Sequence, residues 1–238
     1  MGRAYEVRKA SILKTGAAKA KLYSMYAKEI YQAVKNSGPE VSSNVVLKRL
    51  IERAKKDQVP SDIIKRAIDK VNSGADENYV SVRYELFGPG GSTLIVDCLT
   101  DNVNRTISYI RPALNKNNGK MGVSGSVSYT YDHLCVVGVK NLDEEVALDN
   151  LIENDIDIDD IEKEEGCTMI YGHPQDLYRI KEAINVILPN VEFEVDEISM
   201  FPQTKITLTG SDLESFNKML TMLEEIEDVQ NIYHNVVL

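Results

Sequence analysis

The sequence has no Trp, three Cys and no apolar run near the roughly 20 residues that a membrane-spanning helix needs. Cys98, Cys135 and Cys167 form no C-x-x-C pair, which excludes a disulfide framework and the usual zinc motifs. The basic N-terminus lacks the apolar segment of a secretory signal. With 43% hydrophobic and 27% charged residues, the composition is that of a globular protein, and we expect a cytoplasmic one.

Sequence patterns of catalysis are also missing. The three histidines, His133, His173 and His234, have no metal-ligand spacing, and neither G-x-S-x-G nor H-E-x-x-H occurs. The acidic tract at residues 153–165 lacks the glycine of a calcium loop, and its alternating Ile residues favour an edge strand. We therefore expect a non-enzymatic protein without a metal site or cofactor.

The net charge of −10 hides a strong asymmetry along the chain. Residues 1–72 hold 16 basic and 7 acidic side chains, whereas the remaining residues hold 11 basic and 30 acidic ones. A cationic region joined to an anionic one favours a polyanionic partner for the cationic part. The alternative is that the lysines only solvate a helical bundle.

The cationic region has the 3.6-residue apolar period of helices. Apolar stripes predict three helices, which end near Gly38-Pro39, begin again after Ser42 or Ser43 as N-cap, and resume at Pro60. Their predicted buried faces contain Leu22, Met25, Tyr26, Ile30, Ala33, Val34, Leu47, Leu50, Ile51, Ala54, Ile64, Ala67, Ile68 and Val71. Short helices are marginal alone, so we expect them to bundle.

Basic residues occupy the opposite faces of these helices. Lysines repeat every seven residues along the first helix, and Lys14 extends this ridge only if the helix continues through Gly16. The candidate nucleic-acid-binding residues are Lys21, Lys28, Lys35, Lys48, Arg49, Arg53, Lys55 and Lys56. If all eight met phosphates of duplex DNA, log K against log salt would fall with a slope of about −7.

After a linker at residues 73–76, the apolar period changes from 3.6 to 2. It predicts strands at 79–87, 93–99, 126–131, 134–140, 157–162, 167–172, 191–199, 204–209 and 228–237, with helices at 102–117, 143–153, 175–188 and 211–225. The middle run forms a β-α-β-β-α-β unit, and it interrupts a second such unit. The predicted fold is thus α+β and multidomain: a basic helical domain (1–75), an α+β domain (79–132 plus 203–238), and an inserted α+β domain (133–202), both α+β domains being ferredoxin-like.

Two polar segments form a possible second site. The first contains Glu85 and the glycines Gly88, Gly90 and Gly91, although the loop lacks phosphate-loop spacing and a hairpin turn explains it better. The second is a strand-to-helix junction with Asp101, Asn102, Asn104 and Arg105. These side chains suit either helix capping, which we favour, or binding of phosphate or ribose.

Several segments together resemble the YebC/PmpR family. They are Met1-Gly2-Arg3, Ile51–Pro60, Ala67–Lys70, Tyr84–Gly91, Thr100–Thr106 and Gly125–Tyr129, and they span the chain in order. The start and the Gln58-Val59-Pro60 phrase are closest to its YeeN-like branch. The resemblance implies a helical domain and two α+β domains in a cytoplasmic, non-enzymatic regulator of gene expression.

Two partners remain open at this point. The resemblance implies a DNA-binding transcriptional regulator, and the relation to mitochondrial translational activators implies a translation factor that binds ribosomal RNA or the ribosome. A basic helical face neutralises phosphates of DNA and RNA alike, so the sequence does not separate the two. A third, weaker hypothesis makes the acidic region an enzyme or a scaffold. We expect no membrane partner.

Overall fold

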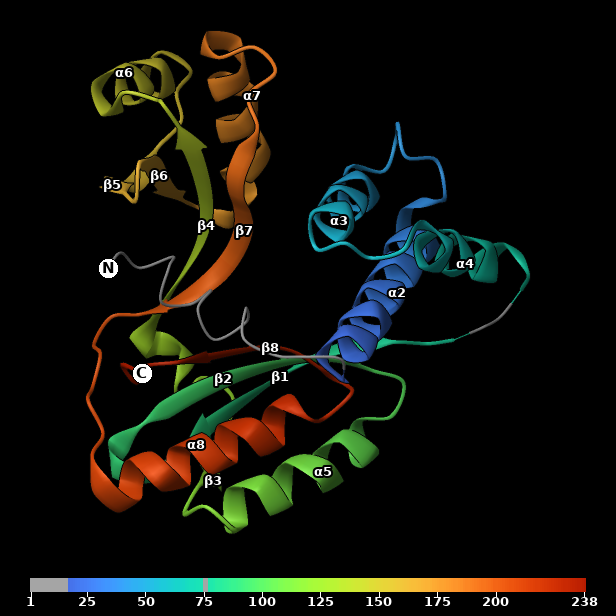
Figure 1. The fold of residues 1–238 in the computed structure, drawn as a ribbon, viewed down its shortest axis with the longest axis vertical. Coiled ribbons are helices and arrows are strands. Elements are labelled where there is room, and N and C mark those ends of the chain that lie inside the picture. The colour runs from blue at the N-terminus through green and yellow to red at the C-terminus, as the bar shows by residue number, and fades with distance from the viewer. Residues whose placement is uncertain (1–16, 75–76) are drawn as a thin grey trace. The chain divides into compact units, whose positions relative to one another are not determined.

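The computed structural model describes residues 17–74 and 77–238. It contains an N-terminal group of helices followed by two α+β regions, each built on a four-stranded antiparallel sheet, so the predicted fold class is confirmed (Figure 1). Within these described ranges, no helix has the length and apolar character needed to cross a membrane.

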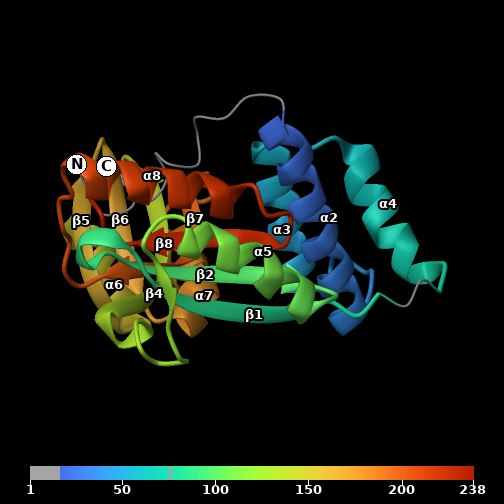
Figure 2. The same ribbon diagram turned by 90° about the horizontal axis from the view of Figure 1, so that it is seen from below.

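In residues 17–74, three helices form a bundle, with α2 packed against both others (Figure 2). They are α2 (Ala17–Ser37), α3 (Val45–Lys56) and α4 (Ser61–Asn72). The predicted apolar stripes supply its core: Tyr26, Ile30, Ala33, Val34, Leu47, Leu50, Ala54, Ile64 and Ala67 are buried, and Leu22, Ile51, Ile68 and Val71 pack against them. Met25, also predicted on the buried face, is only half-buried and lies outside this core.

The N-cap of α3 differs from the prediction. Ser42 and Ser43 are exposed, and Asn44 caps the helix instead, its Oδ1 accepting from the Leu47 amide at 3.0 Å. Its Nδ2 donates to the carbonyls of Ala33 (2.9 Å) and Gly38 (2.8 Å). Asn44 thus satisfies backbone groups of two helices at once, which neither serine can do.

The first sheet has the strand order β3-β1-β2-β8. Its elements are β1 (Val80–Phe87), the turn η1 (Pro89–Gly91), β2 (Thr93–Thr100), α5 (Val103–Asn115), β3 (Lys120–Met121), α8 (Gly210–Glu224) and β8 (Val229–His234). Helices α5 and α8 lie side by side against the sheet (Figure 1). They bury Ile110 and Leu114 of α5 and Phe216 and Leu223 of α8.

The second sheet has the order β5-β6-β4-β7, with every neighbouring pair antiparallel. The chain between β3 and α8 provides it: η2 (Ser128–Thr130), β4 (Tyr131–Lys140), α6 (Glu144–Glu153), β5 (Ile158–Glu164), β6 (Cys167–Gly172), η3 (Pro174–Asp176), α7 (Leu177–Ile187) and β7 (Phe193–Pro202). This is the predicted β-α-β-β-α-β unit, inserted between elements of the first sheet. The acidic tract forms its edge strand β5, as expected.

Two predicted strands are wrong. Residues 126–130 contain the 3-10 turn η2, and the residues from Tyr131 belong to β4 of the second sheet. Residues 204–209 are not a strand, although the Val237 amide donates to the Ile206 carbonyl at 2.9 Å. The predicted unit would pair residues 204–209 with β2. In the structure β1 and β8 already pair with the two edges of β2, so no edge of β2 is left for residues 204–209.

Candidate nucleic-acid interface and the adjacent polar cluster

Helix α3 carries the most exposed part of the predicted basic surface. Its apolar face is buried in the bundle, and Lys48, Lys55 and Lys56 on the other side are exposed. Arg49 and Arg53 are half-buried beside Glu29 of α2. Burial raises the pKa of Glu29, and the two guanidinium groups oppose that rise. We call these five residues of α3 the α3 basic face.

The three lysines of the α2 ridge instead contact the first α+β region. Lys21 donates to the Glu224 carbonyl. Lys28 lies 3.2 Å from an oxygen of Asp228 and 3.5 Å from one of Glu227. Lys35 donates to the Glu77 carbonyl (2.9 Å) and to the Asn78 side chain (2.7 Å). In this structure their charge is therefore directed at the protein itself, while Lys14 lies outside the described residues.

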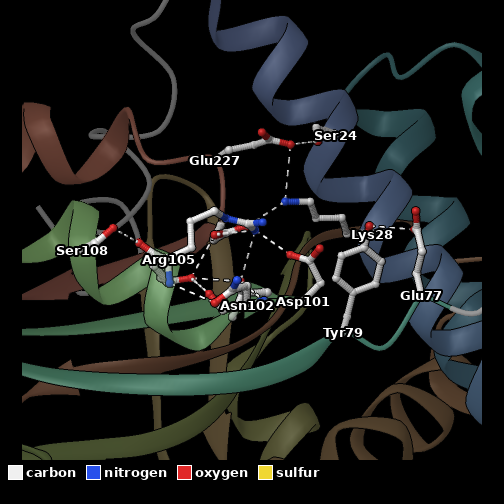
Figure 3. A network of polar contacts seen from close by, with 12 residues as sticks. Ser24, Lys28, Glu77, Tyr79, Asp101, Asn102, Arg105, Ser108 and Glu227 are labelled. Carbon is white, nitrogen blue, oxygen red and sulfur yellow. Dashed lines mark hydrogen bonds and ion pairs between the residues drawn. The ribbon is translucent and has the colours of Figure 1, made fainter.

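Asp228 is the centre of a buried polar cluster at this contact. Its side chain is 4% exposed and accepts from three groups. The Thr106 hydroxyl donates at 2.9 Å, Lys28 at 3.2 Å, and a nitrogen of Arg105 lies 3.2 and 3.1 Å from the two oxygens. Figure 3 shows Lys28 and Arg105 approaching the cluster from α2 and α5. Because Lys28 is 11% exposed, this ion pair is largely hidden from solvent.

Hydrogen bonds keep Asp228 ionised despite its burial. Burial raises the pKa of Asp228, but the bonds from Thr106, Lys28 and Arg105 together outweigh that effect and hold the pKa below the usual value of an aspartate. Removing any of these donors therefore destabilises the charged form. No local sequence pattern marks Asp228, because its partners lie in α2 and α5, far away along the chain.

Tyr79 and Glu77 extend the contact on the other side of Lys28. The Lys28 ammonium lies 5.9 Å from the centre of the Tyr79 ring, and the Tyr79 hydroxyl donates to Glu77 at 2.8 Å. Lys70 of α4 pairs with the other Glu77 oxygen at 2.6 Å, and the Glu77 amide donates to the Tyr31 hydroxyl at 3.0 Å. The chain just before β1 is thus fixed to both α2 and α4.

At the strand-to-helix junction, helix capping is confirmed. Asn102 caps α5 by accepting from the Arg105 amide at 3.0 Å. Asp101 pairs with the Arg105 side chain at 2.5 Å, and Asn104 is exposed on the first turn of α5. Asp101 and Arg105 are therefore held in the Asp228 cluster (Figure 3), whereas Asn104 is exposed to solvent.

Glu85 and the glycine loop have structural contacts of their own. Glu85 is buried, and its two oxygens accept from the amides of Gly125 (2.7 Å) and Val127 (2.5 Å). A Cβ at Gly88 would lie 2.8 Å from Met219 of α8, and Gly90 and Gly91 have positive φ values of 63° and 80°. A hairpin turn packed on a helix accounts for these glycines.

The two predicted polar segments do not form one site. Residues 88–91 join β1 to β2, and residues 101–105 follow the opposite end of β2, since Val80 pairs with Thr100 and Phe87 with Thr93. A strand of this length separates them by about 25 Å. The junction and Lys28 come together instead, through Asp228, which is 123 positions from Arg105 in the sequence.

The described ranges contain no metal site, and two of the three thiols are buried. No group of three His, Cys, Asp or Glu side chains there could hold a metal ion. Burial raises the pKa of Cys98 to about 12 and that of Cys135 to about 11, so both are thiols at neutral pH. Contact of the eight predicted basic residues with nucleic acid stays a prediction.

Comparisons with known proteins match the chain over nearly its whole length. A family model described as the TACO1/YebC protein N-terminal domain matches residues 3–74, and one described as the TACO1/YebC second and third domain matches residues 79–236. A probable transcriptional regulatory protein from Vibrio parahaemolyticus is 47% identical over 238 residues, 100% of both chains. One from Pseudoalteromonas atlantica is 47% identical over 237 residues, 100% of this chain and 98% of the other. The crystal structure of a conserved hypothetical protein from Aquifex aeolicus matches with a TM-score of 0.75 and 33% identity, covering 94% of this chain and 92% of that one.

Proposed function

The chain belongs to the TACO1/YebC family, and from this premise we propose that it is a non-enzymatic regulator of gene expression that binds DNA. The observation that carries the proposal is the α3 basic face on a bundle with a large excess of Lys and Arg, joined to an acidic remainder. Relatives named probable transcriptional regulatory protein support the transcriptional role.

On this face the contacts neutralise phosphates and do not read bases. Lys48, Lys55 and Lys56 present ammonium groups, which bind phosphate as point charges. Asn and Gln, which pair with adenine, do not occur in α3, and its two arginines, which can pair with guanine, are half-buried beside Glu29. We therefore expect high salt dependence and weak sequence discrimination.

The engaged α2 lysines change the expected salt dependence. All eight predicted residues on duplex DNA would give a slope of about −7, whereas the five residues of the α3 basic face alone give about −4.5. The measured slope therefore tells whether Lys21, Lys28 and Lys35 exchange their contacts within the protein for contacts with phosphates when DNA binds. A slope shallower than about −2 would contradict the proposal.

A matched pair of variants tests the location of the interface. Lys48→Gln/Lys55→Gln removes two exposed cations from α3 and is expected to make the slope on duplex DNA shallower by about 1.8. Lys163→Gln/Lys218→Gln removes two exposed cations from the acidic regions and should leave it unchanged. Equal effects of the two pairs would show that net charge, rather than α3, controls binding.

The second candidate is a translation factor that binds ribosomal RNA. The exposed lysines of α3 favour it equally, since such point charges also fit an RNA backbone. Crosslinking in growing cells, with sequencing of bound DNA and bound RNA, separates the two. Promoter DNA enrichment supports the transcriptional role, and ribosomal RNA enrichment with little DNA replaces it by the translational one.

A further inference from the structure

A second cationic surface lies within the otherwise acidic part of the chain. From Asn102 to Tyr131 the sequence has no Asp or Glu but contains Arg105, Arg111, Lys116 and Lys120. All 30 acidic residues that follow residue 72 therefore lie outside this segment. Such a gap concentrates positive potential on α5 and the turn after it.

Helix α5 presents this segment to solvent on one face. Thr106, Ile110, Ala113 and Leu114 are buried against the sheet and α8. Asn104, Ser108, Arg111 and Asn115 are exposed at spacings of four, three and four residues, which places them in one row along the helix. A second exposed row contains Tyr109, Pro112 and Lys116. We call these two rows the α5 face.

The charge of this face is available to a ligand. Arg105 is committed to Asp101 and Asp228. Arg111 and Lys116, in contrast, have no carboxylate within ion-pair distance among the residues that the structure describes. Tyr109 is 56% exposed, whereas Ile110 and Leu114 of the same helix are buried and Val103 and Ile107 are half-buried.

We propose that the α5 face binds an unpaired strand of RNA, as a second contact surface beside the α3 basic face. An exposed aromatic ring stacks on an unpaired base, and flanking cations hold the backbone. Amide and hydroxyl groups in one row can pair with base edges and 2′-hydroxyls. From Asn104 to Lys116 the helix rises about 18 Å, the span of about three nucleotides.

Neighbouring charges explain the choice of a single strand. Helix α8 packs beside α5, and the exposed carboxylates Asp212 and Glu214 near its start and Glu225 at its C-cap outnumber its one cation, Lys218. A duplex about 20 Å wide laid on α5 would bring its second strand towards these groups, and like charges repel. A single strand can follow the α5 face without reaching α8.

The test is the affinity of the full chain for a fluorescent unstructured 12-nucleotide RNA. Because base stacking contributes about 1–3 kcal/mol, Tyr109→Ala is expected to weaken binding about tenfold, while Tyr109→Phe retains it. Arg111→Gln/Lys116→Gln should make the slope of log K against log salt shallower by about 1.4, and Lys163→Gln/Lys205→Gln, outside α5 and α8, should not. These side chains are exposed, so unchanged far-UV circular dichroism is expected for every variant.

Three outcomes overturn the inference. Unchanged RNA affinity in Tyr109→Ala and in Arg111→Gln/Lys116→Gln would show that α5 makes no contact. Equal losses on the single-stranded DNA of the same sequence would refute the assignment to RNA, and equal losses on duplex DNA would refute an unpaired strand. The inference rests on nucleic-acid binding as such, so Lys48→Gln/Lys55→Gln is measured in parallel. On duplex DNA this pair tests the proposed function, whereas on the RNA the α5 variants test the inference. A loss of DNA affinity in Lys48→Gln/Lys55→Gln with unchanged RNA affinity in the α5 variants leaves the proposed function standing and overturns the α5 inference, and unchanged affinity in both measurements overturns both.

Discussion

Replacing Asp228 by Ala should cost far more stability than its place in an acidic segment suggests. The carboxylate is 4% exposed and is the shared acceptor of Lys28, Arg105 and Thr106. Its removal leaves Lys28, itself 11% exposed, without the carboxylate that compensates its burial. Arg105 suffers less, because it is 39% exposed and keeps its contact with Asp101.

The magnitude follows from these contacts. Removing one partner of a buried ion pair typically costs about 3–5 kcal/mol, and the partial exposure of Arg105 places this case near the lower end, about 3 kcal/mol. Asp228→Asn keeps an acceptor oxygen for Thr106 but loses the charge, and about 1–2 kcal/mol is expected. With a urea m-value of about 2–3 kcal/mol/M, Asp228→Ala lowers the unfolding midpoint by about 1–1.5 M.

Urea unfolding followed by far-UV circular dichroism measures the change, with Glu227→Gln as control. Glu227 also faces Lys28, at 3.5 Å, but it is 71% exposed, and exposed pairs contribute at most about 1 kcal/mol. Equal midpoint shifts for Asp228→Ala and Glu227→Gln would refute the claim that the buried carboxylate holds this contact together.

Three further predictions concern other groups. The pKa of Asp228 is lowered in the folded protein, so the stabilisation by its carboxylate is complete above the unfolded pKa of about 3.9 and is lost as the pH falls through the folded pKa. The difference in unfolding free energy between wild type and Asp228→Asn should therefore be constant from pH 6 to 7 and shrink below about pH 4. A difference that does not change with pH would contradict this. Thiol titration with Ellman's reagent at pH 8 should modify the half-buried Cys167 quickly, whereas buried Cys98 and Cys135, with raised pKa values, react only on unfolding; fast reaction of all three would contradict the burial. Glu85→Ala should destabilise the fold by about 2–4 kcal/mol and speed hydrogen exchange of the two amides that it accepts from, with Glu85→Gln milder; unchanged exchange would refute its structural role.

Elements with strong local patterns could be predicted from the sequence. The apolar stripes around Ile30, Leu47 and Ile64 placed three helices, and alternation predicted the inserted β-α-β-β-α-β unit. The family resemblance is likewise confirmed, since it rested on several ordered motifs over the whole chain.

Errors arose where a distant segment decides the outcome. Residues 204–209 alternate like a strand, but the edge of β2 that they would pair with is taken by β1, which lies more than a hundred positions earlier in the chain. The α2 lysines have the spacing of a solvated ridge, and only the fold shows that residues 224–228 reach them. Local patterns give elements and faces, whereas partners of charged groups depend on tertiary structure.

Because β8 comes from the far end of the chain, the first sheet cannot be completed until synthesis is nearly finished. The ribosome releases α2, α3 and α4 early, but β8 and Asp228 leave it among the last residues of the chain. Until then Lys28 lacks its buried carboxylate and β2 lacks one of its two neighbours. A nascent chain thus presents Lys21 and Lys28 beside ribosomal RNA before residues 224–228 exist to receive them, and truncation before Asp228 would leave Lys28 permanently without its buried carboxylate.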